Sequence, residues 1–137
     1  MQLSEAEWKV MNVLWRAGSG SARDVLEALH AETGWAYTTV KTMLSRLAEK
    51  GALSERTAGG AAVYTPRIRQ SATQRAAFRS LVDRAFGGTV GAFVHHLVAQ
   101  EKLSEKERAE LRRLLDAAER DDGGAGVRGG PSGGKQP

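Results

Sequence analysis

Cysteine is absent from this chain of 137 residues. Its absence excludes disulfide bonds, thiolate metal sites and thiol redox chemistry, and it makes a reducing compartment the natural setting. No apolar run approaches the roughly 20 residues that span a bilayer, and the first residues lack the basic-then-apolar pattern of a signal peptide. We therefore expect a cytoplasmic protein that is not inserted in a membrane.

The residues that an enzyme or a metal site requires are also scarce. The chain has three histidines, and none belongs to a recognisable set of acids, bases or nucleophiles. His95 and His96 are neighbours, so they do not share the i, i+4 face through which a helix binds a metal. No phosphate-binding loop of the form G-x-x-x-x-G-K-[ST] occurs. We expect a protein without catalytic activity, metal or cofactor.

Residues 37–51 are the most informative part of the sequence, because they predict a helix with two chemically different faces. One face has the i, i+3, i+4, i+7 spacing of a helix that packs on a core, with Val40, Met43, Leu44 and Leu47. The opposite face carries hydroxyls and cations, which bond phosphate oxygens and base edges in a major groove. Its members are Thr38, Lys41, Thr42, Ser45 and Arg46. An ordinary solvated helix face is the alternative.

The segments on either side place this reading helix in a winged helix-turn-helix. Upstream, Ser21 is a good N-cap for an amphipathic helix that ends at Gly34. Downstream, Gly51 is placed to end the reading helix, and residues 52–65 have the pattern of two strands around a turn at residues 58–60. In such an arrangement the second of the two helices enters the major groove of DNA.

Positive charge is concentrated in the same region. The whole chain carries a net charge of +4. Residues 37–75 alone carry +5, because seven cations face only Glu49 and Glu55, whereas residues 1–36 carry −2. Cations gathered on a reading helix and wing favour a polyanion, since each neutralised phosphate releases condensed counterions. A solvated basic surface without a partner is the alternative. The seven cations are Lys41, Arg46, Lys50, Arg56, Arg67, Arg69 and Arg75.

The N-terminal helix has the clearest start signal in the chain. Ser4 and Glu7 form the S-x-x-E pattern of a capping box, and Leu3 is placed to pack on Trp8 as a hydrophobic staple. An apolar stripe follows, and we expect its residues to be buried packing residues. The stripe consists of Trp8, Met11, Leu14 and Trp15.

The C-terminal half predicts three further helices with apolar stripes, the last opened by a capping box at Ser104. About 50 residues are too few for a stable core of their own, so these helices need a partner surface. We expect two copies to pair into a two-fold homodimer, with packing inside the monomer as the alternative. The expected dimerisation residues are Phe78, Leu81, Val82, Phe86, Phe93, Val94, Leu97, Leu111, Leu114 and Leu115.

The predicted fold class is mainly α with a small β-hairpin. A winged-helix DNA-binding domain at residues 1–70 is followed by a helical dimerisation region at residues 71–122. Residues 123–137 contain seven glycines and almost nothing apolar. We expect this tail to be disordered.

Several of these segments together resemble the penicillinase-repressor (BlaI/MecI-type) winged-helix regulators of bacteria. The resemblance covers the chain to about residue 121, and its most specific part is residues 39–47, Thr-Val-Lys-Thr-Met-Leu-Ser-Arg-Leu. The other shared segments are residues 3–8, 13–15, 35–38, 49–53, 103–105 and 110–115. Members of this family are homodimers that pair through C-terminal helices, bind palindromic operators and block transcription, and some govern resistance to β-lactams.

The resemblance also implies which residues meet DNA. The positions from which the family touches its operator are occupied here by Thr38, Thr39, Lys41, Thr42 and Arg46, with Arg56 and Gly60 in the wing. Ala36 stands where the family often has a serine N-cap, which weakens the start of the reading helix by about 1 kcal/mol.

Two further departures concern the inducing signal. Classical members are cleaved at an Asn-Phe bond in the fifth helix, where this chain has His96-Leu97. The resemblance therefore does not decide whether this route applies here, and a regulatory protease stays an open partner. Copper-responsive relatives use C-terminal cysteines, which this chain lacks.

The sequence thus predicts a homodimeric repressor that binds a palindromic double-stranded DNA operator through its third helix and wing. Its expected targets are β-lactam-resistance or related stress genes. Two alternatives stay open: a winged helix that binds an acidic protein instead of DNA, and an enzyme with unrecognised carboxylate chemistry.

Overall fold

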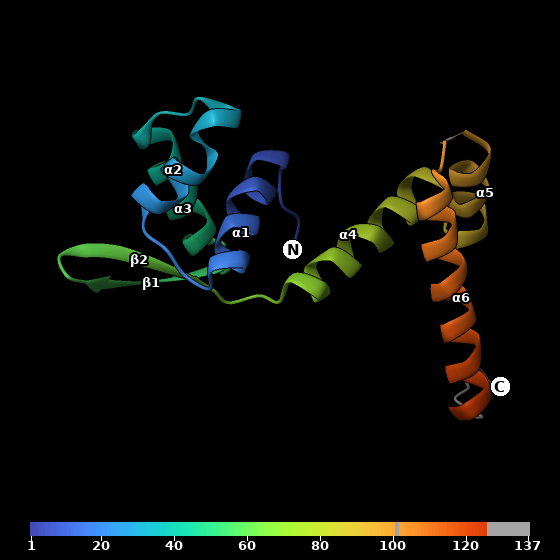
Figure 1. The fold of residues 1–137 in the computed structure, drawn as a ribbon. Coiled ribbons are helices and arrows are strands. Elements are labelled where there is room, and N and C mark those ends of the chain that lie inside the picture. The colour runs from blue at the N-terminus through green and yellow to red at the C-terminus, as the bar shows by residue number, and fades with distance from the viewer. Residues whose placement is uncertain (101, 126–137) are drawn as a thin grey trace. The chain divides into compact units, whose positions relative to one another are not determined.

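The computed structural model of the chain describes residues 1–100 and 102–125, with side chains described as far as Arg120 (Figure 1). It confirms the predicted class, because the described residues form helices and one two-stranded antiparallel hairpin. The elements in chain order are α1 (Glu5–Ala17), α2 (Ala22–Thr33), α3 (Tyr37–Glu49), β1 (Leu53–Ala58), β2 (Ala61–Pro66), α4 (Gln70–Ala85), α5 (Val90–Gln100) and α6 (Glu105–Ala125). None of the helices in this part of the chain is long and apolar enough to cross a bilayer.

The chain divides into two compact units, which meet between Gly88 and Thr89. The first unit therefore contains α4 as well as the three helices and the hairpin that precede it. The sequence places its domain boundary at residue 70, before α4, so the structural division lies further along the chain than that prediction.

The first two helices begin at the predicted caps. Ser4 Oγ accepts a hydrogen bond from the Glu7 N–H at 3.1 Å, and Glu7 Oε1 accepts one from the Ser4 N–H at 2.8 Å. Ser21 and Asp24 make the same reciprocal pair at the start of α2. Each box satisfies N–H groups that have no partner inside the helix, so both starts are fixed by local sequence.

The reading helix α3 starts at Tyr37 without such help, because the Ala36 side chain makes no capping hydrogen bond. The wing follows as β1 and β2, and Ala58 pairs with Ala61. The turn is therefore the pair Gly59 and Gly60, with φ angles of 61° and 81°, and not the predicted residues 58–60. Two positive φ angles match the twist of a tight hairpin, which lets Ala58 stay in its strand.

The core of the first unit lies between α1, α2, α3 and the base of the hairpin. The predicted stripe of α3 is confirmed at Val40, Leu44 and Leu47, which are fully buried, while Met43 is half-buried. The other buried apolar residues of this core are Val10, Met11, Leu14, Ala22, Val25, Leu29, Ala52, Leu53 and Tyr64.

The prediction for α1 needs a correction, because Val10 is buried and both tryptophans are only half-buried. Trp8 and Trp15 lie with ring centres 6.0 Å apart, and Trp15 Nε1 donates to the Ile68 carbonyl oxygen at 2.9 Å. An indole N–H needs an acceptor when its ring is covered, and here the segment after β2 supplies it at the edge of the core.

Tyr64 of β2 connects several parts of the first unit. Its backbone N–H donates to the Gly20 carbonyl oxygen at 2.8 Å and its carbonyl oxygen accepts from the Gly20 N–H at 3.0 Å. This isolated bridge joins the connection between α1 and α2 to the outer edge of β2. A Cβ atom at residue 20 would approach Leu14 Cδ2 to 3.2 Å, so the close approach favours glycine there.

Helix α4 completes the first unit. Gln70 Nε2 donates to Asn12 Oδ1 of α1 at 3.4 Å, and Thr73 Oγ1 donates to the Arg69 carbonyl oxygen at 2.7 Å. The helix ends before the pair Gly87 and Gly88, which both have positive φ angles.

The second unit contains α5 and α6. The predicted capping box at the start of α6 is confirmed, since Ser104 Oγ accepts from the Glu107 N–H at 3.1 Å. Of the side chains described between Thr89 and Arg120, none is fully buried. Helix α6 runs to Ala125, so residues 123–125 are helical, although the sequence assigns them to a disordered tail. Residues 126–137 of that predicted tail lie outside the described residues.

Candidate nucleic-acid interface

The outward face of α3 carries the predicted DNA-binding residues. Its buried stripe fixes the helix on the core, so the hydroxyls and cations on the other side are held outward. Lys41 is half-buried, and the remaining members are exposed: Thr38, Thr39, Thr42, Ser45 and Arg46. Such a face offers hydrogen-bond donors and acceptors with positive charge, which is the chemistry of groove binding.

The wing brings its predicted residues to the surface at two places. Arg56 is exposed in β1, opposite Val63 of β2, and Gly60 forms half of the turn. Gly60 lines a cleft of about 440 Å³ together with Lys41. The cleft lies between the first turns of α2 and α3 and the tip of the wing, and its walls are Ser21, Ala22, Arg23, Tyr37, Lys41, Gly60, Ala61 and Ala62.

Lys41 is held at this cleft by the wing. Its Nζ atom donates a hydrogen bond to the Tyr64 hydroxyl at 3.2 Å. That hydrogen bond is the main cause that raises the pKa of Lys41 above its ordinary value, and the negative charge of Glu55 adds to it. Like an unperturbed lysine, Lys41 is charged at neutral pH.

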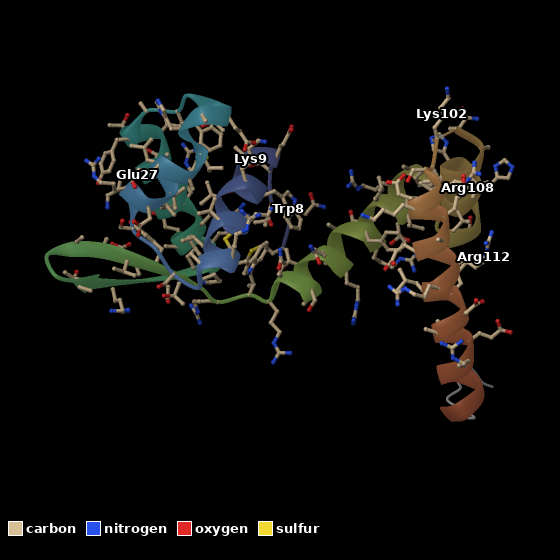
Figure 2. The ribbon with its side chains drawn as sticks, in the orientation of Figure 1. Trp8, Lys9, Glu27, Lys102, Arg108 and Arg112 are labelled. Atoms are coloured by element: carbon tan, nitrogen blue, oxygen red, sulfur yellow. The ribbon has the colours of Figure 1, made fainter. Side chains whose placement is uncertain are left out.

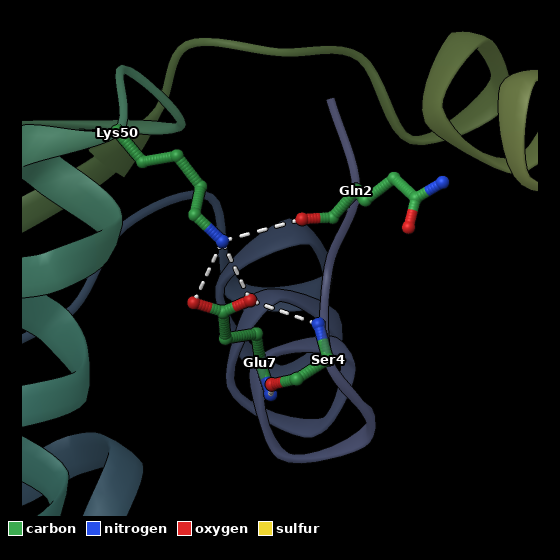
Figure 3. Close-up of polar contacts among 4 residues, drawn as sticks. All are labelled: Gln2, Ser4, Glu7 and Lys50. Carbon is green, nitrogen blue, oxygen red and sulfur yellow. Dashed lines mark hydrogen bonds and ion pairs between the residues drawn. The ribbon is translucent and has the colours of Figure 1, made fainter.

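Lys50 has a different role from the other cations of the region. Its Nζ atom donates to Glu7 Oε1 at 2.8 Å, to Glu7 Oε2 at 2.9 Å and to the Gln2 carbonyl oxygen at 3.2 Å (Figure 3). Partial burial opposes ionisation of Glu7, but the hydrogen bonds from Lys50 and from the Ser4 N–H lower the pKa of this carboxyl. Lys50 thus ties the end of α3 to the start of α1, and its charge is offset by a carboxylate outside residues 37–75.

The structure also shows where the predicted dimerisation residues lie in each unit. In α4, Phe78 and Leu81 are exposed, Phe86 is half-buried and Val82 is fully buried. Because Val82 has no exposed surface, it is the weakest member of the predicted set.

In the second unit, α5 has two apolar sides. Phe93 and Leu97 are half-buried, whereas Val90, Val94 and Val98 are exposed at i, i+4, i+8 spacing. In α6, Leu111 is half-buried, and Leu114 and Leu115 are 51% and 62% exposed. The charged side of α6 carries Arg108 and Arg112, which are labelled in Figure 2. The His96-Leu97 pair lies within α5, the fifth helix.

Acidic and histidine side chains form no metal site in the part of the chain that the structure describes, since no three of them are grouped. The geometry is therefore that of a small winged helix-turn-helix unit with a polar, basic reading helix, followed by a helical unit with exposed apolar side chains.

Comparison with known proteins assigns this architecture to a family. The model of the penicillinase repressor family matches residues 3–117, and the chain belongs to that family, as its sequence motifs predict. Its relatives are repressors and regulatory proteins, so the chain is not an enzyme.

Two curated relatives and one solved structure illustrate the similarity. The penicillinase repressor of Bacillus licheniformis is 35% identical over 115 residues, which cover 84% of this chain and 90% of that protein. The methicillin resistance regulatory protein MecI of Staphylococcus aureus (strain N315) is 27% identical over 115 residues, 84% of this chain and 94% of that protein. A solution structure of monomeric Bacillus licheniformis BlaI with the blaP half-operator is 41% identical, covers 52% of this chain and 87% of that chain, and has a TM-score of 0.46.

Two functional features of the structure are missing from the sequence-based prediction. Tyr64 supports Lys41, and Glu7 binds Lys50 across 43 positions of sequence. The signal for Tyr64 was a single large aromatic residue at an inward position of a short strand, since Ala62 and Tyr64 share one face of β2. No local signal indicated the Glu7–Lys50 pair, because it depends on how α1 and α3 pack.

Proposed function

We propose that the chain is a homodimeric transcriptional repressor that binds a palindromic DNA operator. The reading helix α3 enters the major groove, and the wing lies on the phosphate backbone. The observation that supports this most is the outward face of α3, where five exposed hydroxyl and cationic residues lie away from the buried Val40, Leu44 and Leu47. Membership of the penicillinase repressor family supports the same function.

Within this interface we assign different roles to the two cations of α3. Arg46 is exposed and carries a planar guanidinium, which binds guanine edges through two parallel hydrogen bonds. Lys41 is a point charge held at the cleft beside the wing, which suits a backbone phosphate. Arg56 and Gly60 contact the backbone from the wing.

The second copy of the chain pairs through the apolar side chains of the C-terminal helices. Val94, Leu114 and Leu115 are largely exposed although they are apolar, and the second unit has no fully buried side chain among those described. Burying them against a symmetry mate removes apolar surface from water and gives the two reading helices that a palindrome requires.

Repression then follows from occupation of a promoter, where the bound dimer excludes RNA polymerase. The named relatives regulate penicillinase and methicillin resistance in bacteria, so we propose β-lactam-resistance or related stress genes as targets and the cytoplasm as the location. A β-lactamase or membrane-protease gene beside the gene for this chain would support this choice.

Binding of a fluorescein-labelled duplex from the region upstream of the encoding gene tests the proposal. Anisotropy titrations of the full chain should show tighter binding to this duplex than to a scrambled duplex, and affinity should fall as salt rises. A winged helix that serves only protein assembly gives neither result.

Two variants test the assigned roles. Arg46→Ala should weaken operator binding by about 1–3 kcal/mol and reduce the preference over scrambled DNA, since a base contact is lost. Lys41→Ala should weaken binding to both duplexes and lower the salt slope by about 2, because the dimer loses one phosphate contact at each half-site. Lys9→Ala is the control, because Lys9 binds Glu32 on α2 and lies outside the interface. Equal losses on both duplexes for Arg46→Ala would contradict its role in base recognition.

A further inference from the structure

Tyr64 lies where three segments of the first unit meet. Its ring belongs to the core and is fully buried, and its backbone pairs with Gly20 between α1 and α2. Its hydroxyl is the acceptor for Lys41 of the reading helix. A buried hydroxyl needs a hydrogen-bond partner, and the partner here is a side chain of the proposed DNA interface.

The geometry shows which part of Tyr64 holds the ammonium. Lys41 Nζ lies 3.2 Å from the hydroxyl oxygen and 5.7 Å from the centre of the ring. The distance from Nζ to the ring centre is close to the sum of two others, from Nζ to the hydroxyl oxygen and from that oxygen to the ring centre. The ammonium therefore lies beyond the oxygen and not over the ring face, so the hydrogen bond dominates over a cation–π contact. A phenylalanine at this position keeps the packing and loses the hold on Lys41.

Lys41 lines the cleft between α2, α3 and the wing. Arg23 contributes a second cation to its walls, and Gly60 at the tip of the wing lines it as well. A lysine side chain that makes no contact with the rest of the protein loses rotamer entropy when it binds a phosphate. Lys41 has already been placed by Tyr64 before DNA arrives, so less entropy is lost on binding.

We infer that Tyr64 is a positioning residue for DNA binding, whose hydroxyl presents Lys41 to a phosphate of the backbone at this cleft. The inference rests on the proposed function, since it concerns the same interface. Tyr64 itself touches no DNA, because it has no exposed surface.

A double-mutant cycle on the full chain tests this role. The four proteins are the wild type, Tyr64→Phe, Lys41→Met and the double variant, titrated against the labelled upstream duplex at several salt concentrations. Tyr64→Phe should weaken binding about two- to tenfold for each half-site, because the lysine side chain must then be ordered when DNA binds. In the Lys41→Met background the same change should have no effect on affinity, because there is no ammonium to position.

The control pair uses Lys9, which bears the same charge on another surface. Tyr64→Phe should keep its full effect in the Lys9→Met background. Independent effects of Tyr64→Phe and Lys41→Met, which multiply in the double variant, would show that Tyr64 acts only through the fold and would overturn the inference. Wild-type affinity in Tyr64→Phe would also overturn it. Failure of the wild type to bind the duplex would refute the proposed function itself, and so the two failures are distinguishable.

A measurement on the wild-type protein makes the test independent of any effect of Tyr64→Phe on folding. A hydrogen-bonded lysine ammonium exchanges its protons with water more slowly than a solvated one. The ¹H–¹⁵N signal of the Lys41 ammonium should therefore be detectable when that of the exposed Lys102 is not, and it should shift when the duplex is added. Equally fast exchange at Lys41 and Lys102 would contradict the inference.

Discussion

The first unit and the second unit differ in where their apolar side chains lie. Between Met1 and Gly88 the helices and the hairpin enclose a core with fully buried residues from every one of α1, α2, α3, β1 and β2. Between Thr89 and Arg120 no described side chain is fully buried, and several valines and leucines are exposed. The first unit therefore has the contacts it needs to hold its own fold, whereas the exposed apolar side chains of the second are the surface that the proposed dimer covers.

The largest difference is expected between a leucine-to-alanine substitution in the first unit and the same substitution in the second. Leu44 is fully buried on the inner side of the reading helix, and Leu114 is 51% exposed in α6. Leu44→Ala should lower the free energy of unfolding of the first unit by about 2–5 kcal/mol, because the removed side chain leaves a cavity. Leu114→Ala should change it by less than about 0.5 kcal/mol.

Tryptophan fluorescence during denaturant unfolding measures this difference, because Trp8, Trp15 and Trp35 all lie in the first unit. Leu114→Ala serves as the matched control for Leu44→Ala. Similar losses of unfolding free energy in the two variants would contradict the difference in burial between the two units.

The next prediction concerns self-association. Leu115→Glu places a charge on the apolar side of α6 and should weaken dimerisation at least about tenfold, because burying an unpaired carboxylate is costly. Ala109→Glu is the control, since residues 109 and 115 lie on different faces at about 100° per residue. Sedimentation equilibrium at micromolar concentration measures both.

The measured dimerisation constants test whether α6 carries the interface of the proposed dimer. A monomeric wild type, or equal dimerisation constants for Leu115→Glu and Ala109→Glu, would show that α6 does not carry the dimer interface. The tryptophan unfolding transition of the first unit should stay unchanged in Leu115→Glu.

A smaller effect is expected at the ion pair that joins α1 to α3. Glu7→Gln keeps the capping box but removes the charge that Lys50 binds, and Lys50 is about one-third exposed. The first unit should lose about 1.5 kcal/mol at neutral pH, less than for a fully buried charged pair.

The pH dependence of this loss identifies its cause. The pKa of Glu7 is lowered in the folded state, so its stabilising effect is present above the ordinary value of 4.5 and is lost as pH falls through the folded value. Thermal melts of the wild type and Glu7→Gln should therefore converge in acid. A difference that stays constant from pH 7 to below the ordinary pKa would contradict an ionic origin.

Local features of the first unit could be read from the sequence because each depends on a few neighbouring residues. The boxes at Ser4 and Ser21 follow from spacing of three, and the buried stripe of α3 follows from helical periodicity. The residues of the outward face followed from the same periodicity, since a helix that buries one side must expose the other.

The missed features join residues that are distant in sequence. Trp15 and Ile68 are 53 positions apart, and Lys50 and Glu7 are 43 apart. Such pairs depend on how the helices pack, which no local pattern encodes. The same holds for Tyr64, whose hydroxyl meets Lys41 of α3 from a strand that follows it by 23 positions.

The smallest effect is expected from adding the side-chain cap that the reading helix lacks. Helices α1 and α2 begin with capping boxes, whereas α3 begins at Ala36 without a side-chain acceptor. Ala36→Ser should stabilise the first unit by about 0.5–1 kcal/mol, which raises its melting temperature by about 2–8 °C. Because the first turn of α3 carries Thr38 and Thr39, a better ordered start should leave duplex binding at least as tight. Thermal melts and anisotropy titrations check both parts. No rise in melting temperature would mean that packing of the buried stripe already orders this end of α3, and that core contacts have replaced the missing cap.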